Sequence, residues 1–244
     1  MTTRTLLAVY AHPDDETTSL GGTMAKYAAQ GVDVHVLTAT RGELGTLGTN
    51  GMVIKREDLG KVREAELRSV LRHFGVPNPP TVLDYRDQEL KDTDFEVLTR
   101  QVLDAMMRVR PDVIFTFGPL GISRHDDHIT IHKAAMEAYQ RYQESTGASP
   151  RLLYSAIPKE TAETFEIDID GPEVEPNVFV DVSEQWALKV AALRLYQSQE
   201  DAQQLAGFFE QSPWQYETFH QAYPPLPQGE AVYELWPEAS PAAG

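Results

Sequence analysis

Two short runs of histidine and carboxylate residues are the clearest chemical feature of this sequence. The first is HPDDE, residues 12–16, which directly follows the apolar run LLAVYA. The second is SRHDDH, residues 123–128. Neighbouring carboxylates repel one another, so a positively charged partner is expected beside them. Imidazole and carboxylate groups are also the donors that divalent transition metals accept in proteins. Both runs are therefore candidates for one metal-dependent site.

The two runs together contain the parts of a hydrolytic centre. Two histidines and one carboxylate form a known catalytic zinc set, with the fourth position left for water. Such a site polarises a carbonyl group and brings the pKa of its water to about 7. A spare carboxylate can accept the proton of that water, and a spare histidine can protonate the leaving group or hold the oxyanion. The pattern indicates metal-assisted hydrolysis of an amide or an ester. The candidate residues are His12, Asp14, Asp15, His125, Asp127 and His128.

Each run also has a simpler explanation when it is taken alone. Adjacent carboxylates are common at helix N-termini, where they interact favourably with the helix dipole. His125 and His128 could be ordinary loop and helix-surface residues. His128 and His132 are four residues apart, so this pair could itself hold a metal on one helix face. The spacing alone leaves this rival ligand assignment open.

Elements that would position these residues can be predicted from the alternation of apolar and amphipathic segments. This alternation indicates an α/β fold, a mostly parallel sheet with helices on both faces. HPDDE and SRHDDH each follow a predicted strand, and ligands bind at the carboxyl ends of the strands in such sheets. We therefore expect both runs at the same edge of the sheet. The predicted strands are Thr5–Ala11, Val32–Ala39, Thr81–Tyr85 and Val113–Phe117, and the predicted helices are Thr17–Gln30, Arg56–Phe74, Phe95–Arg108 and Asp127–Glu144.

The pattern changes after Gly147. RLLYSAIP, TFEIDI and VFVDV are typical of shorter strands, and SEQWALKVAALRLYQSQ predicts a helix with Ser183 as its N-cap. The segment TRGELGTLGTNG, residues 40–51, is rich in glycine and threonine, which favours a mobile loop that could close over a substrate. We expect one Rossmann-like domain over residues 1–244, with a C-terminal mixed α/β extension.

Composition excludes several classes of function. The chain has 244 residues and a formal net charge of −16, which disfavours nucleic acid as a partner. It has no cysteine, so a thiolate zinc site and a cysteine nucleophile are excluded. No apolar stretch approaches the roughly 20 residues of a membrane helix. We expect a cytoplasmic protein that acts on a small molecule; whether it forms a homo-oligomer is left open.

The motifs resemble those of a known family. AHPDDE followed by HDDH is similar to the paired signature of the PIG-L/LmbE-like zinc-dependent N-acetylglucosaminyl deacetylases, which include enzymes of mycothiol, bacillithiol and GPI-anchor synthesis. TRGELG, VREAELRSVLRHFGV, LDYRDQEL and TFGPLGISRHDDHITIH resemble further family segments. The resemblance spans about residues 5–220. It implies a metal-dependent amide hydrolase that acts on an amino sugar.

The resemblance also implies roles for individual residues. His12, Asp15 and His128 would be the ligands of one Zn²⁺ per chain, which favours His128 over His132, although Fe²⁺ also suits two histidines and a carboxylate. Asp14 would be the general base. His125 would be the acid or the oxyanion partner, with Asp127 to orient it. Residues that would face the sugar are Glu43, Arg63 and Asp87.

The sequence departs from the family pattern at a few positions. HDDH replaces the common HPDH, so Asp126 adds a negative charge next to His125. Arg124 stands where glycine is usual and could offset that charge. Ser123 occupies a position where some members have tyrosine, and Tyr196 stands where relatives often have histidine. These changes leave the implied metal ligands unchanged. They affect what the resemblance implies about the aglycone of the substrate and about acid catalysis.

The function we expect is deacetylation of an N-acetylglucosamine derivative, with N-acetylglucosaminyl malate of bacillithiol-type thiol synthesis as the leading substrate. Arg63 or Arg124 would then clamp the malate carboxylates. An amidase that cleaves thiol-sugar S-conjugates is the alternative within the family. A nucleotide-binding Rossmann-like protein would need G-x-G-x-x-G after the first strand, which is absent here. A non-catalytic zinc protein would need a fourth ligand rather than an unused base.

Overall fold

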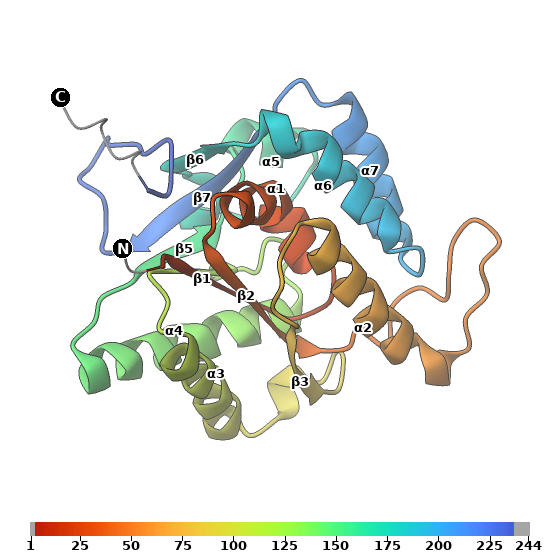
Figure 1. Cartoon of the computed structure of the whole chain (residues 1–244), viewed down its shortest axis with the longest axis horizontal. Coiled ribbons are helices and arrows are strands. Elements are labelled where there is room, and N and C mark those ends of the chain that lie inside the picture. The colour runs from red at the N-terminus through yellow and green to blue at the C-terminus, as the bar shows by residue number, and fades with distance from the viewer. Residues whose placement is uncertain (1–2, 237–244) are drawn as a thin grey trace.

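The computed structural model describes residues 3–236, which form one seven-stranded sheet with the order β3-β2-β1-β4-β5-β7-β6 (Figure 1). The first five strands pair in parallel, and β7 pairs antiparallel with both β5 and β6. The predicted mostly parallel α/β sheet is therefore confirmed. The strands are β1 (Thr5–Tyr10), β2 (Asp33–Thr40), β3 (Thr81–Tyr85), β4 (Val113–Thr116), β5 (Arg151–Ser155), β6 (Val178–Asp181) and β7 (Tyr216–Tyr223).

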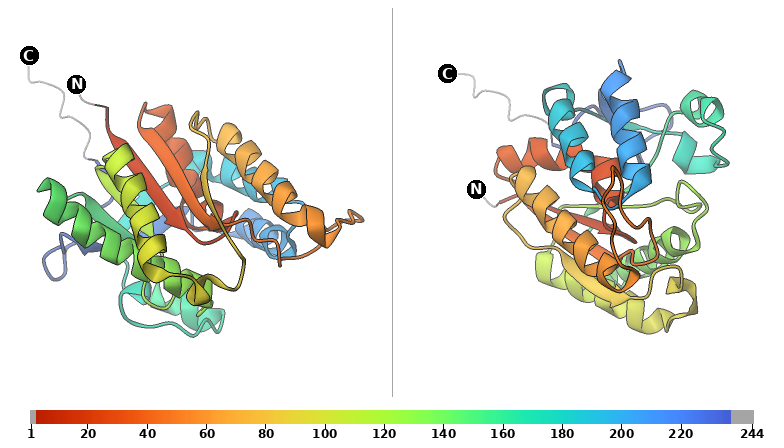
Figure 2. Two further views of the ribbon diagram at one scale, coloured as in Figure 1. Left: turned by 90° about the horizontal axis from the view of Figure 1, so that it is seen from below. Right: turned by 90° about the vertical axis from the view of Figure 1, so that its right-hand side faces the viewer.

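Helices cover both faces of the sheet, as expected from the sequence (Figure 2). One face carries α1 (Asp15–Ala29), α2 (Arg56–His73), α6 (Trp186–Leu195) and α7 (Glu200–Gln211). The opposite face carries α3 (Phe95–Val109) and α4 (Asp126–Thr146). Short elements complete the fold: α5 (Lys159–Thr164) and 3₁₀ turns at Leu90–Asp92, Gly171–Val174 and Ser183–Gln185.

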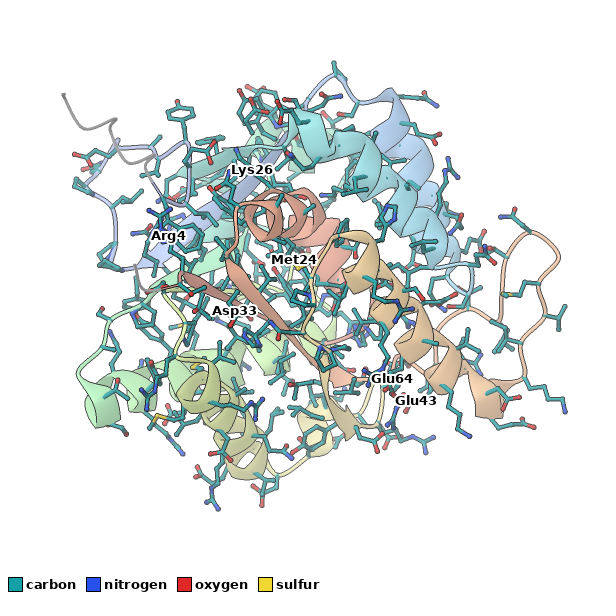
Figure 3. The ribbon with its side chains drawn as sticks, in the orientation of Figure 1. Arg4, Met24, Lys26, Asp33, Glu43 and Glu64 are labelled. Atoms are coloured by element: carbon teal, nitrogen blue, oxygen red, sulfur yellow. The ribbon has the colours of Figure 1, made fainter. Side chains whose placement is uncertain are left out.

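The central strands are buried because they are continuously apolar. Every residue of β1 and β4 is buried. Helices lie over both faces, so neither side of these strands needs the polar residues of a half-exposed sheet. Met24 of α1, labelled in Figure 3, is fully buried in the same core. This rigid centre fixes the positions where β1 and β4 end.

Two predictions for the C-terminal part are wrong. TFEIDI is not a strand: Pro158 precedes the helix α5, and the chain then continues irregularly with Phe165 half exposed. Only Thr164 of this segment lies in α5, and the N–H groups of Ile167 and Ile169 donate to Ala162 O and Ile167 O at 2.9 and 3.0 Å, so local bonds replace strand pairing. Ser183 does not cap the following helix, because Asp181 Oδ1 accepts its N–H at 2.9 Å and a 3₁₀ turn forms before α6 begins at Trp186. The prediction also contained no counterpart of α7 or β7.

The glycine-rich segment after β2 has no regular secondary structure, as predicted, but it is anchored. Gly48 N–H and Thr49 N–H donate to the carbonyl groups of Ser198 and Gln197, at 3.1 and 3.0 Å. The Gln199 side chain accepts from Thr46 N–H and donates to Thr46 O, at 3.3 and 3.2 Å. These bonds fasten the segment to the connection between α6 and α7. The hypothesis of a mobile lid therefore rests on composition alone.

The helices of residues 3–236 include none whose length and apolar character would let it cross a bilayer.

Candidate active site

The two motif segments meet at the carboxyl ends of neighbouring strands. β1 pairs in parallel with β4, HPDDE follows β1, and SRHDDH leads into α4 after β4. The strand order changes direction here, with β2 on one side of β1 and β4 on the other. Such a switch point leaves a crevice at the strand ends, where α/β proteins bind their ligands. The common edge predicted from the sequence is thus confirmed for these two segments.

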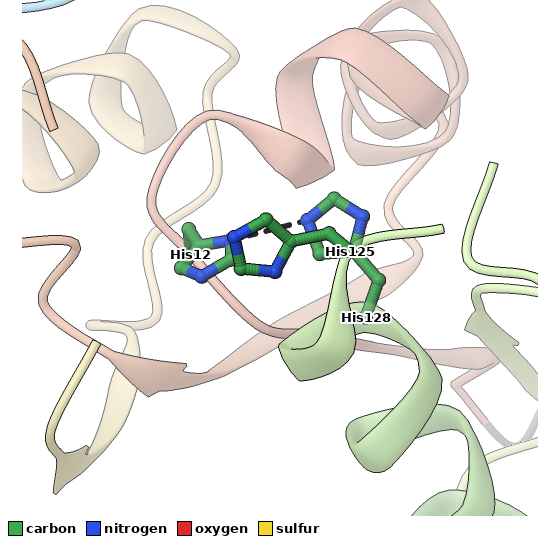
Figure 4. A group of neighbouring side chains, drawn as sticks. All are labelled: His12, His125 and His128. Carbon is green, nitrogen blue, oxygen red and sulfur yellow. Dashed lines mark hydrogen bonds between the residues drawn. The ribbon is translucent and has the colours of Figure 1, made fainter. Parts of the chain in front are cut away.

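Donor atoms of three residues lie close together in this crevice. His12 Nδ1 is 3.1 Å from His128 Nε2 and 3.5 Å from the nearer oxygen of Asp15. His128 Nε2 is 3.4 Å from the other Asp15 oxygen. Two ligands about 2.1 Å from a tetrahedral cation would be separated by roughly 3.4 Å. The two nitrogens are therefore spaced as ligands of one divalent ion, and Asp15 faces each of them with a different oxygen. Figure 4 shows how the two imidazoles converge beside His125.

The outward-facing nitrogens of both imidazoles have fixed partners. His12 Nε2 lies 3.1 Å from Asp127 Oδ2 and 3.2 Å from Asp87 Oδ1. His128 Nδ1 lies 2.9 Å from the carbonyl oxygen of Gly121. Metal-binding histidines commonly donate their second N–H to a carboxylate or a carbonyl, which fixes the tautomer and the ring orientation. The second partners thus support the inner triad as a metal site.

Two other groups of residues could also hold a cation. His12, His125 and His128 form one, and His12, Asp87 and Asp127 form the other. In the second group both Asp127 oxygens already accept backbone N–H bonds, from Gln88 at 2.7 Å and from Leu90 at 3.1 Å. Carboxylate oxygens that are occupied in this way have less to offer a metal. This disfavours the second group, whereas the first shares His12 and His128 with the triad and lies on the same face of His12.

The charges of the triad follow from burial and from its neighbours. Burial raises the pKa of Asp15, but His128 and His12 hold it well below its usual range. Burial also lowers the pKa of His128, which favours the neutral form that a metal ligand needs. Burial lowers the pKa of His12, yet bonds to Asp127, Asp15 and Asp87 raise it well above its ordinary value. The surplus of negative charge around His12 is the charge that a divalent cation would balance.

Asp14 occupies an unusual backbone conformation beside the triad. Its φ of 105° is rare for any residue other than glycine, and such strain is concentrated at functional sites. Asp14 Oδ2 accepts a bond from Arg63 Nη2 at 2.7 Å, and Oδ1 has no partner among residues 3–236. Burial raises the pKa of Asp14 well above its usual range, and Arg63 opposes the shift. Such a carboxylate is suited to accept a proton near neutral pH.

Arg63 is a buried cation on α2 rather than an open clamp. Besides Asp14, its guanidinium donates to Pro13 O at 2.5 Å and to Gly42 O at 2.9 Å. Gly42 has a φ of 61°, and a side chain there would overlap this guanidinium, so glycine is needed for the approach. The expected contact with a substrate remains a prediction, whereas the contact with Asp14 is direct.

His125 and Asp127 lie at the start of α4. His125 is the N-cap, and its Nδ1 accepts the N–H of Asp127 at 3.2 Å. The imidazole of His125 lies 4.9 Å from that of His12, measured between ring centroids. Asp127 was expected to orient His125, but in the structure its carboxylate bonds to His12 instead. The reason is that the first turn of α4 directs this fully buried side chain towards the β1 edge and the N–H groups after β3.

Glu43 and Asp87 lie on two adjoining loops. Glu43, labelled in Figure 3, accepts the N–H of Asp87 through Oε1 at 3.0 Å. Its Oε2 is buried without a partner among residues 3–236. Asp87 Oδ2 accepts the N–H of Leu44 at 2.9 Å, while Oδ1 faces His12. Glu43 therefore keeps one buried acceptor without a partner among residues 3–236, whereas Asp87 is occupied by protein groups.

A buried pair next to the triad was not predicted. Glu16 Oε1 accepts the hydroxyl of Tyr196 at 2.6 Å, and Glu16 Oε2 accepts the N–H of Asp14 at 3.0 Å. Burial raises the pKa of both side chains. The pair ties the strained Asp14 backbone to α6. Glu16 was part of the noted acidic run, but only the tertiary structure places Tyr196 beside it.

The residues that depart from the family pattern have partners outside the triad. Arg124 pairs with Asp168 at 2.8 Å, and Asp126 pairs with Lys91 at 2.5 Å. The charge of Asp126 is therefore balanced by Lys91 instead of Arg124. His132 is buried, with Nδ1 2.8 Å from Phe117 O, which agrees with a packed helix residue.

Comparison with known proteins agrees with these motifs. The family model PIG-L, described as GlcNAc-PI de-N-acetylase, matches residues 7–139. A 1D-myo-inositol 2-acetamido-2-deoxy-alpha-D-glucopyranoside deacetylase of Mycobacteroides abscessus is 32% identical over 234 residues, 82% of each chain. The chain belongs to the PIG-L family. For several other relatives of the same description, the match covers only about half of the relative's length.

Solved structures extend the likeness to the C-terminal part. An N,N'-diacetylchitobiose deacetylase from Pyrococcus horikoshii has a TM-score of 0.63 at 25% identity, covering 89% of this chain and 83% of that one. GalB, a 4-carboxy-2-hydroxymuconate hydratase from Pseudomonas putida, has a TM-score of 0.71 at 20% identity, covering 94% and 100%. One fold thus carries out two kinds of reaction, so the function of this PIG-L member must be argued from its site.

Proposed function

We propose that this PIG-L protein is a metal-dependent N-deacetylase that hydrolyses the acetamido group of an N-acetylglucosamine glycoside. One observation carries the proposal: the imidazole nitrogens of His12 and His128 and the carboxylate of Asp15 converge at 3.1 to 3.5 Å, next to Asp14, whose Oδ1 has no partner among residues 3–236. A ligand triad with an adjacent base is what hydrolysis of an amide requires. The family match supports the same reaction class.

His12, Asp15 and His128 would hold one divalent cation. Zinc is the first candidate, because two histidines and a carboxylate with an open position form a known catalytic zinc set, and Fe²⁺ is the second. When bound, the cation would lower the pKa of a water molecule and polarise the amide carbonyl. Asp127 and Asp87 hold His12 from its outer side, and Gly121 O holds His128.

Asp14 would move the proton, and His125 would stabilise the oxyanion. Asp14 accepts a proton from the attacking water through its unbonded Oδ1, while Arg63 keeps Oδ2 in place. A new C–O bond forms at the acetyl carbon and the C–N bond breaks. Asp14 gives its proton to the departing amine, so the products are acetate and the free amino sugar. His125 Nδ1 accepts the Asp127 N–H, so Nε2 carries the ring proton and donates a hydrogen bond to the developing oxyanion.

Glu43 would bind the sugar. Its buried Oε2 has no partner among the described residues, and a sugar hydroxyl could donate to it. Asp87 and Arg63 were expected to contribute as well. Both are already bonded to protein groups, so their effect on the sugar would be exerted through His12 and Asp14 respectively.

A neutral polyol aglycone suits this site better than malate. Arg63 donates to three protein oxygens and Arg124 is paired with Asp168, so neither offers a free clamp for two carboxylates. The acidic surroundings would also repel a malyl group. The described relatives act on an inositol glycoside. We therefore place an inositol-type aglycone ahead of the malyl sugar that the sequence suggested.

The test is acetate release by metal-free protein, before and after one equivalent of zinc, from three N-acetylglucosamine compounds. These are the myo-inositol glycoside, the malyl glycoside and the free sugar. We expect zinc-dependent release, with the inositol glycoside preferred. Preference for the malyl glycoside would overturn the aglycone assignment. If none of the three releases acetate although zinc binds, the deacetylase proposal fails, and amine release from thiol-sugar S-conjugates becomes the function to test.

A further inference from the structure

The His128 ring is held by a loop that is itself unusual. His128 Nδ1 lies 2.9 Å from Gly121 O and 3.2 Å from Ser123 Oγ; a carbonyl oxygen only accepts, so the shorter bond, to Gly121, requires a proton on Nδ1. Gly121, Ile122 and Arg124 all have positive φ angles, of 66°, 61° and 57°. A Cβ on Gly121 would lie 2.5 Å from His128 Cβ, so the loop passes directly against the ring. Something must hold this strained backbone in place.

A buried carboxylate from the C-terminal extension fills that role. Glu173 lies in the 3₁₀ turn Gly171–Val174 and is fully buried. Its Oε2 accepts the N–H of Leu120 at 2.8 Å, and its Oε1 accepts the N–H of Ile122 at 2.8 Å. Each oxygen therefore fixes one residue on either side of Gly121. Backbone N–H groups around αL residues form such concave anion sites.

The absence of a side chain at Gly118 makes space for this carboxylate. A methyl group at Gly118 would overlap the Glu173 side chain, so glycine is required where the loop leaves β4. The turn that carries Glu173 is bonded to the end of β5, where Ile157 N–H donates to Glu173 O at 2.9 Å. Glu173 is thus tied to the sheet by its backbone and to the loop by its side chain. It also lies beyond residue 139, where the family match ends.

We propose that Glu173 is a positioning residue that aims His128 at the metal site, acting through Gly121 O. The proposal rests on the proposed function in so far as His128 is a ligand. Without the two bonds from Glu173, the Gly121 carbonyl would lose its fixed direction, and the ring could turn away from Asp15. Removing a residue that orients a metal ligand from outside typically weakens metal binding by about 10–100-fold.

The first experiment uses metal-free protein, so it does not depend on the metal. Imidazole ¹⁵N NMR reports which nitrogen of His128 carries the proton. We expect the Nδ1–H tautomer in the wild type and its loss, or a mixture of tautomers, in Glu173→Gln. The glutamine is nearly isosteric but turns an N–H donor towards a backbone N–H. Wild-type His128 signals in Glu173→Gln would overturn the proposal.

The second experiment measures zinc affinity by competition with a chromophoric chelator. Glu173→Gln should raise the Kd for zinc by about 10–100-fold. Glu175→Gln is the matched control, because it makes the same change at an exposed glutamate two residues away and should leave the Kd unchanged. An unchanged Kd in Glu173→Gln would also count against the proposal. If the wild type itself bound no zinc, the proposed metal centre would fail, while the NMR experiment would still decide the role of Glu173.

A second variant covers the case in which Glu173→Gln does not fold. If far-UV circular dichroism shows that Glu173→Gln is unfolded, Glu173→Asp takes its place in both experiments. Aspartate keeps the charge but is one methylene shorter, so it should reach only one of the two N–H groups. We expect an intermediate zinc affinity for Glu173→Asp. Full wild-type affinity and tautomer in a folded Glu173→Asp would refute a requirement for both bonds.

Discussion

At the scale of single residues, the main feature of the site is that three carboxylates adjacent in sequence have different partners. Asp15 faces the two histidines, Asp14 faces Arg63, and Glu16 is buried against Tyr196. Asp14 precedes α1 with a positive φ, whereas Asp15 and Glu16 lie in the first turn of that helix, so the three side chains leave the backbone in different directions. Like charges that are adjacent in sequence are therefore each given a different partner. Two predictions follow from this arrangement.

Replacing the base should abolish turnover without emptying the metal site. In Asp14→Asn we expect kcat to fall by roughly 10²–10⁴-fold, the usual contribution of a positioned base. The triad atoms belong to other residues, so the zinc content should stay near one per chain. Acetate release and metal analysis on the same sample would check this. A variant that keeps its turnover would show that Asp14 is not the base.

Removing the partner of the base should move the pH profile in a known direction. Burial raises the pKa of Asp14, and the positive charge of Arg63 lowers it. Arg63→Gln removes the lowering contribution, so the pKa of Asp14 rises further. Because the base must be deprotonated, the acid limb of kcat/KM should shift to higher pH. Arg63→Lys, which keeps the charge, should shift it less; equal shifts in both variants would contradict this account.

At the scale of elements, helix α1 carries Asp15 and is broken at Leu20, where φ is −143° and ψ is 27°. The break is stabilised from the C-terminal extension. Lys189 Nζ donates to Thr18 O at 2.8 Å, and Glu217 accepts the N–H groups of Gly22 and Thr23 at 2.9 and 2.7 Å. Groups left unpaired by the break therefore have partners on α6 and β7. The helix that begins at the proposed metal site is held from the far part of the chain.

The Lys189–Glu217 pair should be important for stability. The two charges are buried and 2.6 Å apart. Glu217→Gln leaves the lysine charge buried without a counter-ion, so unfolding free energy should fall by about 3–5 kcal/mol. Denaturant titration would measure it. Glu163→Gln, which breaks the exposed pair with Lys159, is the control and should cost no more than about 1 kcal/mol. A similar loss of unfolding free energy in both variants would contradict this prediction.

At the scale of the whole molecule, the net charge of −16 is concentrated in part at the strand ends. Several carboxylates surround His12, and among residues 3–236 only Arg63 and the histidines oppose them at close range. Bringing these groups together on folding therefore costs electrostatic free energy. A divalent cation that binds only the folded chain would offset that cost and stabilise the protein by linkage.

Metal loading should therefore raise the thermal midpoint. At zinc concentrations about 100 times Kd, linkage gives about 2.7 kcal/mol, which corresponds to a rise of roughly 5–10 °C for a chain of this size. Thermal melts of chelator-treated and reloaded protein would measure it. His12→Gln should show little or no rise, because it lacks a triad donor. An equal rise in His12→Gln would mean that the ion binds elsewhere on the acidic surface.

Much of the site was predictable from the sequence because it depends on local features. The apolar run before His12 ends a buried strand, and the run before SRHDDH does the same, so topology alone puts both motifs at one edge. The order of β1 and β4, the spacing of the triad and the partner of Asp127 depend on packing between distant segments. No local pattern marks Tyr196, Glu173 or Glu217 as neighbours of the first helix and its loops.

The sequence by itself determined the α/β class, the two histidine and carboxylate motifs and the reaction class that they indicate. Periodicity and residue chemistry are local properties, which a single chain displays directly. The tertiary structure decided which carboxylate meets which partner, that Arg63 is occupied by protein oxygens, and that the C-terminal extension supports the site. Those contacts join residues up to about 195 positions apart, as between Gly22 and Glu217. Only the packed core fixes such pairs, because burial forces each polar group to find a partner.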